Sequence, residues 1–244
     1  HAHLGLVGWF LLLIIGAASI LIPMFMISHN LNMKKLDYSY YFINIGLLIA
    51  ITNWFLLQSK YITMLAWVGI AMGVGFFLSF VYETYSTRLR RKLDVGLKYT
   101  VISISFLIIP ILLALFLLLT GSSSAFILRA TTIYGISMIF GVISMLIFGQ
   151  TYKTLPFIVW LDRYQNYVGK YKTPLPRQLY SEKLADIQFY SYLFAISFII
   201  IGVILKQAVI LQIGTIALIF VGVLNLVNIL KMVWHKTTIE DLDS

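Results

Sequence analysis

Long apolar segments recur along the whole chain and are separated by shorter polar connections. Most are about twenty residues long, the length that an α-helix needs to cross the hydrocarbon core of a bilayer. The sequence lacks the ten-residue stretches of alternating apolar and polar residues that are typical of membrane β-barrels. The pattern predicts seven helical spans, at residues 4–27, 40–57, 61–85, 97–119, 126–148, 185–205 and 209–234.

These spans predict an all-α fold, because lipid offers the backbone no hydrogen bonds and each helix satisfies its own. We expect a polytopic transmembrane bundle that forms a single domain over residues 1–244. The composition agrees, since 60% of the residues are hydrophobic and 11% are charged, against about 25% charged in soluble domains. The sequence has no cysteine, so a metal or haem within this chain cannot depend on thiolate ligands or thioether attachment.

The basic residues predict the orientation in the membrane. The net charge is +9, and lysine and arginine gather in every second connection, which is the distribution of cytoplasmic loops. We therefore expect the N-terminus outside and the C-terminus inside a bacterial cytoplasmic membrane, with no nucleic-acid partner. The residues concerned are Lys34, Lys35, Arg88, Arg90, Arg91, Lys92, Arg163, Lys170, Lys172, Arg177, Lys183, Lys231 and Lys236.

The longest connection, residues 150–184, is expected to lie along the inner membrane surface. Pro156 should bend or end the preceding helix. A short interfacial helix would follow, with Trp160, Tyr164 and Tyr167 at the level of the lipid headgroups. Two interpretations remain open for this basic segment: a docking surface for a partner or for anionic lipid, and an ordinary cytoplasmic loop.

Polar side chains within the spans are few. All nine acidic residues lie in or beside the predicted inner loops and tail, which argues against a carboxylate-driven antiporter or ion pump. The last span has no central lysine, which excludes a retinal protein. Asn44 and Asn53 in the second span, and Asn225 and Asn228 in the last, either hydrogen-bond between helices or line a polar transport path.

Two histidines, His1 and His3, open the first apolar span. On a regular helix they are about 200° apart, so they would face opposite sides. This spacing favours two separate centres, or one ligand and one spectator, over a metal shared by both. His29 is about 39 Å further along a helix and cannot complete the same site. If His1 were a processed terminus, its amine and the two imidazoles would instead suit copper.

The sequence His1-Ala2-His3, followed by Gly8-Trp9 on an apolar helix, resembles the H-x-H helix of the haem–copper oxidase superfamily. This superfamily includes the catalytic subunits of cytochrome oxidase and nitric oxide reductase. The same residues are similar to the opening of haem- and copper-containing nitric-oxide-response membrane proteins. The resemblance implies that His1 faces a high-spin haem or copper and that His3 is an axial ligand of a low-spin haem. The family's three further copper histidines, second axial ligand and cross-linked histidine–tyrosine pair have no counterpart in this stretch.

Three functions follow from these observations. The first is a haem-binding integral membrane subunit that transfers electrons, or reduces oxygen or nitric oxide once other segments complete its centres. The second is a non-catalytic scaffold or assembly subunit without a cofactor, and the third is a small-solute transporter. The first helix starts abruptly, so we expect a fragment of a longer protein. Its expected partners are membrane lipid and either other membrane subunits or a missing N-terminal half.

Overall fold

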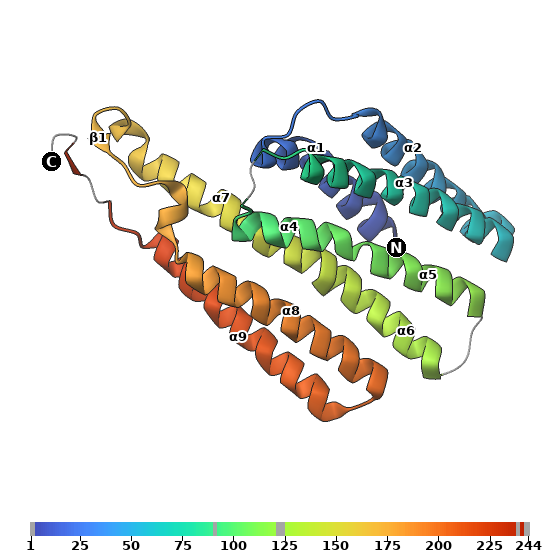
Figure 1. The fold of residues 1–244 in the computed structure, drawn as a ribbon. Helices are drawn as coiled ribbons and strands as arrows, with labels where there is room; N and C mark the ends of the chain where they lie inside the picture. The colour runs from blue at the N-terminus through green and yellow to red at the C-terminus, as the bar shows by residue number, and fades with distance from the viewer. Residues whose placement is uncertain (1–2, 90–91, 121–124, 238–239, 242–244) are drawn as a thin grey trace. The chain divides into compact units, whose positions relative to one another are not determined.

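The structure, a computed structural model, describes residues 3–89, 92–120, 125–237 and 240–241, and these are almost entirely helical (Figure 1). The α-helices are α1 (Leu12–Met26), α2 (Lys34–Thr52), α3 (Lys60–Ser86), α4 (Val95–Phe106), α5 (Ile108–Thr120), α6 (Ala125–Ile136), α7 (Met145–Tyr164), α8 (Glu182–Leu205) and α9 (Ala208–Val233). Three π-helical segments, Leu4–Leu11, Asn53–Leu57 and Ser137–Ser144, continue helices without interruption. Short 3₁₀ turns lie at Gln165–Tyr167 and Pro176–Leu179, and β1 (Tyr171–Lys172) pairs antiparallel with β2 (Glu240–Asp241).

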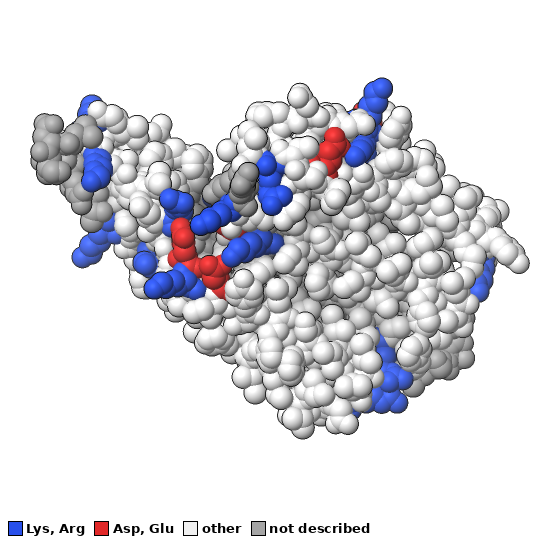
Figure 2. Space-filling model, viewed as in Figure 1, with Lys and Arg blue, Asp and Glu red and all other residues white. Residues whose placement is uncertain are grey.

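Seven helical segments among the described residues are long and apolar enough to cross a membrane. This confirms the predicted all-α class and the number of spans, and the chain is an integral membrane protein. The surface agrees, because most of the face seen in Figure 2 is uncharged and the charged side chains gather in small groups. The spans are Leu4–Met26, Lys34–Leu57, Lys60–Ser86, Val95–Thr120, Phe126–Tyr167, Glu182–Leu205 and Ala208–Val233.

The fifth span is much longer than the sequence predicted. The helix does not stop at Phe148 but runs for 42 residues to Tyr167, or about 63 Å, twice the hydrocarbon thickness. Pro156 lies inside α7, so the prediction of a separate interfacial helix starting after it is wrong. Proline removes one backbone hydrogen bond, and tertiary contacts hold the helix beyond it. One of them is the hydrogen bond from Trp160 Nε1 to the carbonyl of Pro174, 2.6 Å long.

The chain forms two compact units. Unit 1 comprises residues 1–93 and 104–134, and unit 2 comprises residues 94–103 and 135–244. In unit 1, α2 and α3 lie side by side along their length (Figure 1). Their backbones approach so closely that a Cβ at Gly46 would lie 2.8 Å from the carbonyl of Ala66, and one at Gly73 would lie 2.9 Å from that of Ser39. Small residues at these positions thus allow the close approach of helices that is typical of membrane proteins.

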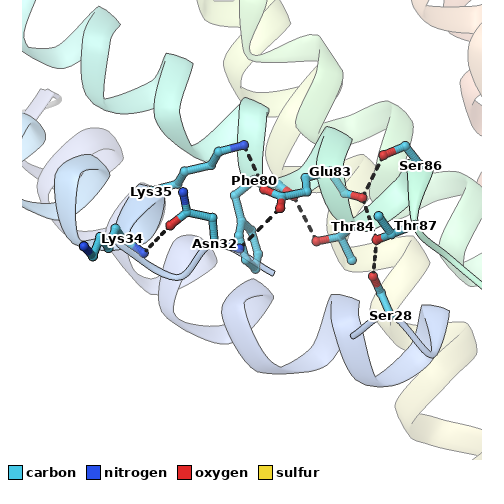
Figure 3. Close-up of polar contacts among 9 residues, drawn as sticks. All are labelled: Ser28, Asn32, Lys34, Lys35, Phe80, Glu83, Thr84, Ser86 and Thr87. Atoms are coloured by element: carbon cyan, nitrogen blue, oxygen red, sulfur yellow. Dashed lines mark hydrogen bonds and ion pairs between the residues drawn. The ribbon is translucent and has the colours of Figure 1, made fainter. Parts of the chain in front are cut away.

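One end of unit 1, which we call the loop end, is closed by polar contacts around Glu83 near the end of α3 (Figure 3). Its carboxylate pairs with Lys35 at 2.8 Å and accepts the backbone N–H of Asn32 at 3.3 Å. Beside it, the hydroxyls of Ser28 and Thr87 are 2.5 Å apart. These contacts attach the α1–α2 connection to the end of α3.

Unit 2 is organised by the α8–α9 hairpin (Figure 1), against which α7 and the start of α4 pack. Its centre is aromatic, with the Tyr99 ring perpendicular to Phe189 at a centroid distance of 4.9 Å and close to Phe148 and Tyr192 at 6.0 Å. Here α4 crosses α7 at a glycine pair, and a Cβ at Gly149 would lie 2.8 Å from the carbonyl of Gly96. Such a contact leaves no room for a side chain.

Replacing Gly149 by alanine should therefore destabilise the protein, because the new methyl group forces α4 and α7 apart. We expect a loss of about 1–3 kcal/mol, as for other overpacked sites. Gly222→Ala in α9 is the matched control, since a Cβ there meets nothing within 4 Å and alanine is the better helix former. Thermal unfolding in detergent measures both. Equal melting temperatures for the two variants would contradict the glycine contact.

Candidate functional site

His3, at the start of the first span, pairs with Tyr134 of α6 within unit 1. The imidazole Nε2 and the Tyr134 hydroxyl are 3.2 Å apart, and the rings stack with centroids 6.0 Å apart at 27°. Because the hydroxyl can donate to Nε2 or accept from it, this contact orients the ring without fixing its tautomer, and it leaves the other ring nitrogen for a ligand. Nothing in the sequence pointed to Tyr134 beyond its being a hydroxyl within an apolar span.

The surroundings of His3 favour a neutral imidazole. Although part of the side chain stays accessible, desolvation lowers the pKa of His3 below its ordinary value. The neutral form is the one that binds metals and haem iron. His3 therefore has the protonation state that the predicted axial ligand needs.

The other histidines do not join His3. His1, the second predicted ligand of haem or metal, lies outside the described residues. His29 is exposed at the loop end of unit 1, and His235 belongs to unit 2 beside Tyr164, 2.8 Å away. No group of three or more histidine, cysteine or acidic side chains within the described ranges could hold a metal ion.

A haem and a copper centre differ in how well these residues suit them. A haem iron needs one axial imidazole in apolar surroundings, and His3 precedes exposed Leu4, Trp9 and Phe10 on an apolar helix. These residues could hold a haem from one side, and the second axial ligand of a low-spin haem would have to come from elsewhere. A copper centre of the family type needs several histidines, and the residues that the structure describes bring none to His3, so its other ligands would have to come from elsewhere.

Unit 2 contains a second polar cluster, the Tyr152–Gln188–Asn228 network, which links α7, α8 and α9. The Tyr152 hydroxyl donates to Gln188 Oε1 at 2.5 Å and accepts from Asn228 Nδ2 at 3.1 Å. The Asn228 Oδ1 accepts the backbone N–H of Ser181 at 3.0 Å, and Gln188 Nε2 reaches Asn225 at 3.5 Å. Tyr152, Gln188 and Asn228 are at most 3% exposed.

This network confirms interhelical hydrogen bonding for Asn225 and Asn228. Asn44 instead donates to the carbonyl of Tyr40 in its own helix, and Asn53 bonds to Ser59 and Thr63 across the turn before α3. Asn44 is thus used within one helix, whereas Asn53 joins the end of the second span to Thr63 of α3. The sequence analysis missed Tyr152 and Gln188, because a single tyrosine or glutamine near a predicted helix end has no distinctive spacing.

Ion pairs surround the end of unit 2 at which the network lies. Lys153 pairs with Asp94, and Lys98 pairs with Asp186 at 2.7 Å. The first pair joins α7 to the residue that precedes α4, and the second pair joins α4 to α8.

Because α8 begins and α9 ends near the level of these ion pairs, the part of α7 after Pro156 extends beyond both helices. We call residues 157–180 and 234–237 the projection.

The projection is held by its own polar contacts and has an apolar surface. Arg163 donates to the carbonyls of His235 and Val233, the latter at 3.0 Å. Burial lowers the pKa of His235, and the nearby charges of Arg163 and Lys231 lower it further. The large exposed apolar side chains of the projection are Phe157, Ile158, Val168, Tyr171, Leu175 and Trp234.

Comparison with known proteins gives no family assignment: no protein-family model, curated protein or solved structure matches the chain significantly.

Truncating Asn228 tests the network in unit 2. Asn228→Ala should cost about 1–3 kcal/mol of stability, because the Ser181 N–H loses its acceptor and the Tyr152 hydroxyl a donor in a buried site. Asn44→Ala, which removes a bond within one helix, should change stability by less than about 0.5 kcal/mol. Denaturant unfolding in detergent micelles measures the difference. A cost for Asn228→Ala no larger than that for Asn44→Ala would show that the network contributes little.

The His235 contact should depend on pH. Since its pKa is lower in the folded state than the ordinary value of 6.5, the unfolded state binds more protons between the two values and stability rises with pH there. The stabilising contact between neutral His235 and Tyr164 is fully present above about pH 6.5, and it weakens as the pH falls toward the lower, folded-state pKa of His235. Histidine NMR should give a titration midpoint below 6.5, and limited proteolysis after Lys236 should increase in acid. His235→Gln should remove that pH dependence, and cleavage of this variant that still increases in acid would assign the effect to another group.

Proposed function

We propose that the protein is a haem-binding integral membrane subunit in which His3 is an axial ligand. The observation that carries the proposal is the His3–Tyr134 pair, in which a neutral imidazole is oriented by a hydroxyl at the start of an apolar span. The resemblance of His1-Ala2-His3 and Gly8-Trp9 to the H-x-H helix of haem–copper oxidases adds to it. This resemblance concerns the site and assigns no reaction by itself.

The residues have separate roles in this proposal. His3 supplies a ring nitrogen to the iron, and the Tyr134 hydroxyl holds the other nitrogen so that the ring keeps one orientation. The apolar side chains of the first span keep water away from the iron. Haem would supply one-electron chemistry. Reduction of oxygen or nitric oxide would require His1 at a high-spin haem or copper, with further ligands from other segments or subunits.

The proposed orientation follows from the basic connections. The loop end of unit 1, with Lys34 and Lys35, and the projection, with Lys170, Lys172 and Arg177, would lie on the cytoplasmic side. His3 would then lie near the outer surface of a bacterial cytoplasmic membrane. Its proposed partners are lipid and the membrane subunits that complete the haem site.

The projection favours a second function, that of a non-catalytic scaffold or assembly subunit. It extends α7 past the neighbouring helices and exposes Phe157 to 50% and Trp234 to 72%. Exposed apolar side chains beside basic ones are typical of surfaces that bind another protein. A cofactor is not needed for this role, so the two functions are separable by experiment.

Absorption spectroscopy of the protein, expressed from its complete gene and purified from membranes, tests the haem proposal. We expect a Soret band and reduced α-bands that His3→Ala removes, because the iron loses its axial ligand. Tyr134→Phe should lower haem affinity about tenfold, the usual cost of losing a ligand's hydrogen-bond partner.

His29→Ala is the matched control, since His29 is exposed at the other end of the same span. It should leave the spectrum unchanged. A purified protein without haem or copper would reject the proposal and favour the scaffold. A spectrum that persists in His3→Ala would reject His3 as the ligand.

A further inference from the structure

A groove of about 440 Å³ separates α1 from α2 in unit 1. The two helices meet near Gly8, where an added Cβ would lie 3.3 Å from Leu47, and the groove lies between them toward the loop end. A Cβ added at Gly16 would meet nothing within 4 Å. The groove is lined by Leu12, Ile15, Gly16, Ser19, Met33, Leu36, Asp37 and Tyr40.

The groove is apolar in its depth and charged at its mouth. Leu12 and Ile15 of α1 line the part furthest from the loop end, while the Ser19 hydroxyl is turned to the carbonyl of Gly16 at 2.7 Å. From Leu12 to Ser19 the wall is about 10 Å long. At the mouth stands Asp37, an exposed residue in the first turn of α2.

Lys34 supplies a positive charge near the negative charge of Asp37. Lys34 and Asp37 are three apart on α2, so they are neighbours on one helix face. Lys35 is engaged by Glu83 at 2.8 Å, and Figure 3 shows Lys34 directed away from Glu83. Lys34 does not itself line the groove, but its place three residues before Asp37 on α2 brings a cation within reach of a lipid headgroup at the mouth.

We propose that this groove is a binding site for phosphatidylethanolamine. An acyl chain occupies the apolar wall, the lipid phosphate pairs with Lys34, and the lipid ammonium donates hydrogen bonds to the carboxylate of Asp37. This phospholipid joins a phosphate to a primary ammonium and carries no further anionic group, so its two charges match those of Lys34 and Asp37 in sign. Hydrogen bonds between ionised partners are stronger than neutral ones, so Asp37 distinguishes an ammonium with N–H donors from one without.

Other occupants fit the groove less well. Phosphatidylglycerol has no cation for Asp37, and phosphatidylcholine has a quaternary ammonium that cannot donate a hydrogen bond. A helix of another subunit, or of a second copy, would take Asp37 out of water beside apolar side chains, and burying an ionised carboxylate is costly. Charge complementarity thus favours a zwitterionic lipid with a free ammonium.

Native mass spectrometry of the delipidated full chain tests the proposal without any substitution. The protein is titrated with phosphatidylethanolamine, its N-methyl and N,N-dimethyl forms, phosphatidylcholine and phosphatidylglycerol, all with the same acyl chains. We expect affinity to fall along the methylation series, with phosphatidylethanolamine bound about fivefold more tightly than phosphatidylcholine. Equal affinities along the series would overturn the proposal, and so would a preference for phosphatidylglycerol.

Variants then locate the site. Asp37→Asn should reduce the preference over phosphatidylcholine to near unity, whereas Lys34→Ala should weaken both lipids alike, because they share the phosphate. Gly16→Leu should fill the groove and lower the affinity for phosphatidylethanolamine about fivefold or more. Leucine there enters open space, so the fold should be unaffected.

Matched controls are Asp162→Asn, an exposed carboxylate of the projection, and Gly222→Leu, an open glycine of α9. Neither should change lipid binding. Unchanged binding in Gly16→Leu, or equal losses in Gly16→Leu and Gly222→Leu, would show that the lipid sits elsewhere. A delipidated protein that dimerises through this groove and binds none of the lipids there would assign it to a second copy.

Discussion

The constraint on which this protein depends is that a polar group within a bilayer must find its partner inside the protein. The Tyr152–Gln188–Asn228 network shows how unit 2 meets it, because a hydroxyl, two amides and a backbone N–H satisfy one another across three helices. The hydrogen bonds of Asn228 also determine where the α8–α9 hairpin ends. By bonding to Ser181, the residue before α8, it fixes where the α8–α9 hairpin stops beside α7. The rest of α7 then has no helical neighbour to follow, and it packs instead on the loop and tail that form the projection.

The same constraint explains how unit 1 is assembled. Association of α2 with α3 uses no buried charge, because glycines bring the two backbones within van der Waals contact and dispersion replaces the hydrophobic effect that lipid cannot provide. Polar pairs between these two spans lie at their ends, with Glu83 and Lys35 at the loop end and Asn53 and Thr63 at the other. Helix α1 is packed less closely on α2, and a groove remains where small residues face no partner. Glycine thus occurs both where α2 and α3 pack tightly and where the groove stays open beside Gly16. The two cases differ in whether a neighbouring helix has a surface that fits against the glycine.

Much of the fold could be predicted from the sequence, because the bilayer restricts which segments can form its spans. Hydrocarbon thickness fixes the length of an apolar segment, so seven spans followed from the apolar pattern, with most boundaries close to those of the structure. The fifth span was predicted too short because Pro156 was expected to bend or end the helix, whereas α7 continues through it to Tyr164. Asn225 and Asn228 were recognised as polar residues on one helix face, but their partners Tyr152 and Gln188 come from other helices. Such contacts between distant segments leave no trace in local periodicity, and neither does the pairing of His3 with Tyr134.

His3 is less completely satisfied by hydrogen bonds than Asn228 or Glu83, and it shares this property with His235. Asn228 uses both its oxygen and its nitrogen within the fold, and Glu83 is engaged by a lysine and a backbone N–H. His3 has one nitrogen at the Tyr134 hydroxyl and an accessible ring in front of exposed apolar side chains. His235 is oriented by the Tyr164 hydroxyl in a similar way, at 2.8 Å, and Arg163 donates to its backbone carbonyl. What distinguishes His3 is its place at the start of an apolar span, where an accessible and oriented imidazole is suited to a ligand.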